Sequence, residues 1–203
     1  MKFSEVFGTP GDLKVWTQLA EEIGGQFWGA TPEYMNSGGI GHTVHLKVEQ
    51  GPVFLEAFTD RAVGEPGSEQ VRMRAPYQDK DGFRFTISRE HLFTGLGKLF
   101  GAQDVETGDP AFDDDFVIKS NDEAKARVLF ADPRIRQLLR EQPYVFFQAR
   151  DSEAPPGSPL LGAASTELYF LLRHDQAKDI ARLKALFELF TETLGQFRAI
   201  GSA

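Results

Sequence analysis

Three consecutive aspartates lie in the stretch GDPAFDDDFVIKSND, residues 108–122, directly before an apolar segment. Asp109, Asp113 and Asp115 have the chemistry to bind Mg²⁺ or Ca²⁺, because these hard cations prefer several carboxylate oxygens at once. Such a site would support a divalent-metal-assisted hydrolase or transferase. The stretch does not follow the calcium-loop pattern, which has glycine at its sixth position and glutamate at its twelfth.

A structural role for the same aspartates is the alternative that we favour. If residues 112–119 form a strand, Asp113 and Asp115 share one face and Asp114 points to the other. Asp109 and Asp113 would accept hydrogen bonds from backbone N–H groups where the chain enters the strand, and Asp114 would be exposed. This role predicts that Asp113→Ala costs about 1 kcal/mol through a lost hydrogen bond.

The four histidines do not suggest a second metal site. His42 and His45 are close in sequence, but an odd separation along a strand directs their rings to opposite faces. His91 and His174 are isolated, so either would need partners from elsewhere in the fold to act as a base. We interpret all four as surface or capping residues.

Two glycine-rich stretches resemble nucleotide-binding loops only superficially. A phosphate-binding loop of the G-x-x-x-x-G-K-[ST] type needs Ser or Thr after its lysine, but in GLGKLFG Lys98 is followed by Leu99. NSGGIGH, residues 36–42, precedes a strand and does not link a strand to a helix, as a dinucleotide-binding loop does. No nucleophile elbow is present, so the sequence supports no catalytic mechanism and predicts no cofactor.

Composition narrows the class of protein further. There is no cysteine, which excludes disulfides and thiolate chemistry. Net charge is −8, and residues 104–123 carry eight acidic residues and one lysine, a local charge of 1 − 8 = −7. A chain without a basic stripe is unsuited to nucleic acid. Without a signal peptide or a membrane-spanning stretch, a cytoplasmic protein is expected.

Hydrophobic periodicity predicts mainly strands in the first half of the chain. An amphipathic helix is expected after Asp12 as N-cap, ending at Gly24. Residues 43–49 and 53–59 alternate as a hairpin. Residues 70–75 and 83–87 alternate again around the turn sequence QDKDG, so a second hairpin is expected.

Helices and strands alternate in the second half. The strand at 112–119 should bury Phe112 and Phe116, which share a face. The expected elements that follow are a helix capped by Ser120 with Glu123, a helix beginning at Asp132 and Pro133, a pair of strands at 144–150 and 167–174, and a helix at 176–197. The loop at 151–166 is rich in Pro, Gly and Ser and is expected to be mobile.

These elements predict one α+β domain over residues 1–203, with a mainly antiparallel sheet built from hairpins and covered by helices, including a long C-terminal helix. That helix should dock on the sheet through one apolar face, whose residues are Ile180, Leu183, Phe187, Phe190 and Leu194. Leu186 and Leu189 make this apolar face wider. Any part of the wider face that the sheet does not cover would be an apolar surface through which two copies of the protein form a homodimer.

The middle of the chain resembles an uncharacterised family of bacterial proteins in which a Thr-Gly-Asp-x-x-Phe-Asp stretch precedes a Phe-x-Val strand and a helix. The residues that carry the resemblance are Thr107, Gly108, Asp109, Phe112, Asp113, Phe116 and Val117. The resemblance covers the C-terminal half best. It implies an α+β domain and no activity.

From these observations we predict a non-catalytic cytoplasmic binding or interaction domain. Its partner would be a protein or an apolar small molecule that meets a phenylalanine-rich surface, since the chain contains eighteen phenylalanines. The metal-assisted enzyme at Asp109, Asp113 and Asp115 is one alternative. A carrier of a small apolar ligand is the other, suggested by the rings listed here: Phe83, Phe85, Phe146 and Phe170.

Overall fold

The computed structural model describes residues 10–28, 40–49, 51–59, 69–89, 103–152, 166–173 and 176–203. The predictions for His91, for His174, for the glycine-rich stretch at 95–101 and for most of the loop at 151–166 lie outside the described residues. The sheet, the helices and the acidic segment at 104–123 lie within them.

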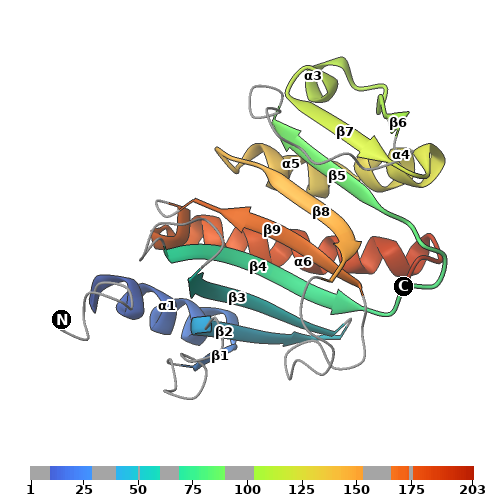
Figure 1. Cartoon of the computed structure of the whole chain (residues 1–203). Coiled ribbons are helices and arrows are strands. Elements are labelled where there is room, and N and C mark those ends of the chain that lie inside the picture. The colour runs from blue at the N-terminus through green and yellow to red at the C-terminus, as the bar shows by residue number, and fades with distance from the viewer. Residues whose placement is uncertain are drawn as a thin grey trace.

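Among the described residues, nine antiparallel strands form one sheet in the order β1-β2-β3-β4-β9-β8-β5-β7-β6 (Figure 1). The strands are β1 (Gln26–Trp28), β2 (Ile40–Val48), β3 (Gly51–Thr59), β4 (Glu69–Tyr77), β5 (Phe85–Arg89), β6 (Gln103–Asp104), β7 (Phe116–Ser120), β8 (Phe146–Asp151) and β9 (Thr166–Leu172). The α+β class with a mainly antiparallel sheet is therefore confirmed.

The helices cover one face of this sheet, and the longest of them crosses behind the central strands in Figure 1. They are α1 (Pro10–Ile23), α3 (Pro110–Asp113), α4 (Glu123–Ala131), α5 (Pro133–Arg140) and α6 (Ile180–Ala199), with a 3₁₀ turn at η3 (Gln176–Lys178). Contacts of α1, α4 and α5 with α6 place these helices in one layer. The opposite face of the sheet carries no described helix.

Helix α6 docks on the sheet as predicted, although it begins later. Residues 176–178 form a 3₁₀ turn, and Asp179 caps α6 by accepting a hydrogen bond from the Arg182 N–H. Its predicted docking face is buried, with Ile180 partly buried at the start. Leu186 and Leu189 are also fully buried within the same chain. The edge from which we expected a homodimer therefore offers no large apolar surface.

The first predicted hairpin is confirmed, and the second is wrong. Strands β2 and β3 pair with His45 opposite Phe54. Strand β4, however, pairs with β3 and β9, while β5 pairs with β7 and β8. The pair β8 and β9 is inserted between β4 and β5. Alternation of apolar residues identified each strand correctly, but it does not specify which strand is the neighbour.

Local signals placed some helix ends correctly and others not. Helix α5 begins after Asp132, whose carboxylate accepts from the N–H groups of Arg134 and Ile135, as predicted. Helix α1 begins at Pro10, so Asp12 lies inside it and is not its N-cap. Helix α4 is capped by Asp122, whose carboxylate accepts from the Lys125 N–H, and not by Ser120, whose oxygen accepts from the Asp122 N–H before the helix begins.

Phenylalanine rings fill the core between the sheet and the helices. Phe85 is fully buried at its centre and meets the rings of Phe130, Phe147 and Phe197 edge to face at 5.2, 5.4 and 6.2 Å between centroids. Phe83 and Phe170 are buried in the same cluster. These rings pack against one another in the core, so they are not part of the phenylalanine-rich surface that we expected to meet a partner.

Candidate functional site

The acidic segment forms a tight turn between β6 and β7. Gly108 has φ = 83°, a left-handed backbone conformation that glycine adopts without strain. One carboxylate oxygen of Asp113 accepts from the backbone N–H and the hydroxyl of Thr107 at 2.9 and 2.8 Å, and the other accepts from the Gly108 N–H at 3.1 Å. Asp113 thus closes the turn, as the predicted structural role requires. It lies at the end of a short helix, however, and not on the predicted strand.

The strand predicted at residues 112–119 begins only at Phe116. Pro110 starts α3, since its fixed φ suits the first helical position, and Asp109 caps that helix by accepting from the Phe112 N–H. Phe112 and Phe116 are buried and Asp114 is exposed, as predicted. The predicted burial of both phenylalanines is therefore confirmed, but Phe112 is buried from helix α3 and not from a strand.

Arginines of α5 neutralise the two remaining aspartates of the predicted metal set. Asp109 lies 2.8 Å from Nη1 of Arg136 and 3.9 Å from Nη2 of Arg140, and Asp115 lies 3.5 Å from Nε of Arg140. Both guanidinium groups also lie over the Phe112 ring, 5.3 and 5.4 Å from its centroid. Within the described residues, no three His, Asp or Glu side chains are grouped so as to hold a metal ion.

Asp113→Ala is expected to lower the free energy of unfolding by about 2 kcal/mol, because three hydrogen bonds to one carboxylate are lost together. Thermal or urea unfolding measures the change. Asp114→Ala removes the neighbouring, exposed carboxylate and is the matched control, with an expected change within about 0.5 kcal/mol. Equal effects of the two substitutions would show that the turn does not depend on Asp113.

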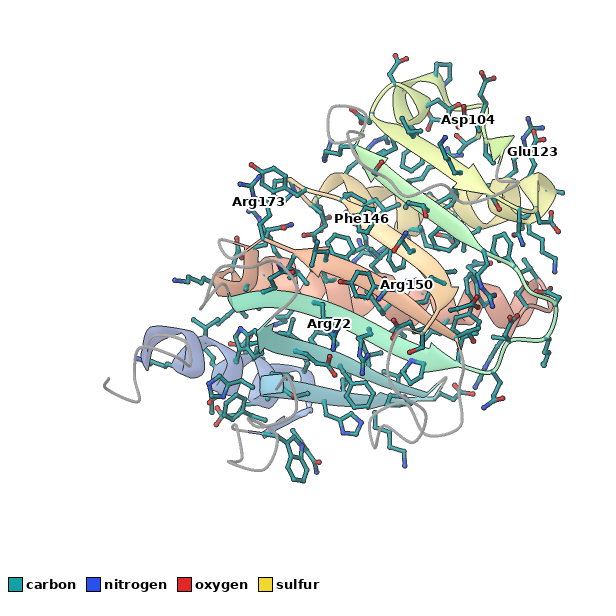
Figure 2. The ribbon with its side chains drawn as sticks, in the orientation of Figure 1. Arg72, Asp104, Glu123, Phe146, Arg150 and Arg173 are labelled. Carbon is teal, nitrogen blue, oxygen red and sulfur yellow. The ribbon has the colours of Figure 1, made fainter. Side chains whose placement is uncertain are left out.

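A groove of about 520 Å³ opens beside this turn. Its lining residues are Asp104, Val105, Glu106, Gly108, Pro110, Asp113, Asp114, Phe116, Val117 and Ile118. Four of these are carboxylates and none is Lys or Arg. Asp104 of β6, which is labelled in Figure 2, has a side chain that is 77% exposed, and its carboxylate lies 3.5 Å from Nζ of Lys119. The groove therefore combines an apolar floor with an acidic rim.

A second cluster of charges, which the sequence analysis missed, lies on the face of the sheet without described helices. Five side chains from β3, β4, β8 and β9 alternate in charge: Arg72, Glu56, Arg74, Glu167 and Arg150. Consecutive members are joined by N–O distances of 2.8, 3.1, 3.4 and 3.1 Å. Figure 2 shows Arg72 and Arg150 in front of the central strands, with α6 behind them.

These ion pairs are buried, which makes them costly to form. Glu56, Glu167 and Arg74 have at most 2% of their surface exposed. Burial raises the pKa of Glu167, although Arg74 and Arg150 oppose that effect. The Arg150 guanidinium also stacks on the Tyr169 ring, 3.6 Å from its centroid. The sequence carried only part of the signal for this cluster, since Arg72 and Arg74 alternate with apolar residues in β4 and Glu56 and Glu167 are acids within apolar strands.

The two described histidines have separate surroundings. His45 stacks on Phe54 with 4.7 Å between ring centroids, whereas His42 stacks on Phe27 at 6.0 Å. Burial, with a smaller contribution from Lys47, lowers the pKa of His45.

Comparison with known proteins gives one distant likeness. No family model and no curated protein matches the chain. In the search of solved structures, the crystal structure of the mycobacterial trehalose monomycolate transport factor A, TtfA, aligns with 93% of each chain at 9% identity and a TM-score of 0.49. A likeness at this level carries no argument about function. None of the described helices is long and apolar enough to cross a membrane.

Proposed function

We propose that the protein is a non-catalytic interaction domain that binds a basic, extended segment of a partner protein in the acidic groove beside the turn that connects β6 and β7. The observation that carries this proposal is the combination of an open groove of about 520 Å³ with four lining carboxylates and no lining cation. Carboxylates around a groove favour a partner of opposite charge and raise its association rate.

The apolar part of the groove distinguishes a peptide segment from a bare cation. Val105, Pro110, Phe116 and Val117 line the groove together with the acids. An extended segment that alternates basic and apolar side chains satisfies both kinds of surface, because successive side chains of such a segment point in opposite directions.

Two observations disfavour the alternative functions. Asp109 and Asp115 pair with arginines and Asp113 with backbone N–H groups, so a metal ion would have to displace all of these partners. Calorimetric titration with Mg²⁺, Mn²⁺ and Ca²⁺ tests that alternative directly. For the apolar-carrier alternative, three of the four phenylalanines that suggested a ligand cavity are packed in the core, namely Phe83, Phe85 and Phe170.

The test is a binding titration with the fluorescein-labelled peptide acetyl-(Lys-Val)₃-amide, followed by fluorescence anisotropy at about 50 mM salt, where screening is weak. We expect saturable binding by the full chain. The double substitution Glu106→Gln with Asp114→Asn should weaken this binding about tenfold, which corresponds to about 1.4 kcal/mol. Asp113 stays unchanged in this variant because it closes the turn.

The matched control is Glu49→Gln with Glu192→Gln, which removes the same net charge far from the groove. Glu49 follows β2 near the opposite end of the sheet, and Glu192 lies on α6. This control should bind the peptide like the wild type. Equal weakening by both double variants, or equal binding of acetyl-(Glu-Val)₃-amide, would show that net charge and not the groove attracts the peptide.

A further inference from the structure

Strand β6 forms one edge of the described sheet. Strand β6 is last in the strand order, with β7 on one side and no described strand on the other. The backbone N–H of Val105 donates to the Ile118 carbonyl of β7 at 2.9 Å. In an antiparallel ladder alternate residues turn their backbone groups to the same neighbour, so Asp104 and Glu106 direct theirs away from β7.

The outward backbone groups of this edge are in part engaged. The Glu106 carbonyl accepts a hydrogen bond from Nε of Arg127 at 3.0 Å. The N–H groups of Asp104 and Glu106 and the carbonyl of Asp104 also point away from β7, and no described residue forms a backbone hydrogen bond with them. These three groups form a short template of the kind to which an added strand hydrogen-bonds.

Acidic and apolar side chains alternate along this edge, as basic and apolar side chains would along the proposed partner segment. Val105 is buried toward the helices, whereas Asp104 and Glu106 are exposed on the other face. On an added strand, residues opposite Asp104 and Glu106 would point to the acidic face, and the residue between them would lie beside Val105. Opposite charges directly across a strand pair are stabilising.

We infer that the partner segment binds by adding an antiparallel strand to β6, with basic residues opposite Asp104 and Glu106 and an apolar residue opposite Val105. This inference rests on the proposed function and specifies how the same groove is filled. The antiparallel direction follows the rest of the sheet, in which every described strand pair is antiparallel.

A different explanation is that the acidic residues only protect an exposed edge from aggregation, as charged residues do at many sheet edges. Protection alone needs no cavity. Asp104, Val105 and Glu106 of this edge all line the groove, and this is what favours an occupant.

The experiment compares two N-methylated forms of acetyl-(Lys-Val)₃-amide with the unmodified peptide. Methylation of the three lysine nitrogens removes the N–H groups that would face β6, and methylation of the three valine nitrogens removes those that face away. We expect the first form to bind at least tenfold more weakly and the second to bind like the unmodified peptide. Hydrogen exchange at the amides of Asp104 and Glu106 should slow about tenfold when the unmodified peptide binds.

The outcomes separate the inference from the function on which it rests. If both methylated forms bind like the unmodified peptide and the two amides exchange unchanged, the peptide is held by side chains alone, and strand addition is wrong while the proposed function stands. If the unmodified peptide does not bind, both are wrong. If Ca²⁺ or Mg²⁺ binds with heat that Glu106→Gln with Asp114→Asn abolishes, and the peptide does not bind, the groove is a cation site.

Discussion

Glu167→Gln is expected to lower the free energy of unfolding by about 3–5 kcal/mol, the effect of removing one partner from a buried ion pair. Its carboxylate contacts Arg74 and Arg150 at 3.4 and 3.1 Å and is fully buried. Glutamine keeps the shape but removes the negative charge, so both guanidinium groups lose a counter-charge in a site of low polarity. Urea unfolding at neutral pH measures the loss.

The control for this prediction is Glu188→Gln, which breaks the pair between Arg134 and Glu188. The side chains of that pair are 40% and 42% exposed, and exposed pairs contribute at most about 1 kcal/mol. A loss below about 1 kcal/mol for Glu167→Gln would mean that water reaches the Arg74 and Arg150 guanidinium groups in the folded protein.

Phe85→Ala is expected to destabilise the protein by about 3–5 kcal/mol, because the substitution leaves a cavity that the surrounding rings fill only in part. Phe85 is fully buried and meets the rings of Phe130, Phe147 and Phe197. For a chain of this length the melting temperature should fall by roughly 6–20 °C. Differential scanning calorimetry provides this measurement.

Phe85→Leu is the companion variant, since it keeps most of the volume and should cost less than about 2 kcal/mol. Val128→Ala is a surface control, because Val128 is 55% exposed on α4. If Phe85→Ala were as mild as Val128→Ala, the rings would not be packed as closely as their separations of 5.2 to 6.2 Å imply.

The parts of the fold that depend on neighbouring residues were predictable from the sequence. Asp132 followed by proline correctly predicted the start of α5, and Gly24, with φ = 69°, ends α1 as expected. The error at β4 and β5 has a different origin. Whether two strands pair depends on which other strand covers each edge, and here β8 and β9 come from a part of the chain that follows almost sixty residues later.

The candidate site was likewise predictable only where it depends on residues that are close in sequence. The excess of acid at 104–123 is visible in the sequence, and so is the turn chemistry of Asp113. The arginines that neutralise Asp109 and Asp115 lie more than twenty residues away on α5, and no local pattern joins them to the acids. The Arg72 to Arg150 cluster required the register of four strands, which only the structure supplies.

The insertion of β8 and β9 between β4 and β5 has a consequence for biosynthesis. While the ribosome is still making the second half of the chain, β4 has only β3 to pair with, and β5 has only β7 once that strand emerges. The two halves of the sheet can join only after residues 146–172 have left the exit tunnel. Until then the nascent chain carries two unpaired apolar edges, which is the state that chaperones bind and from which aggregation begins.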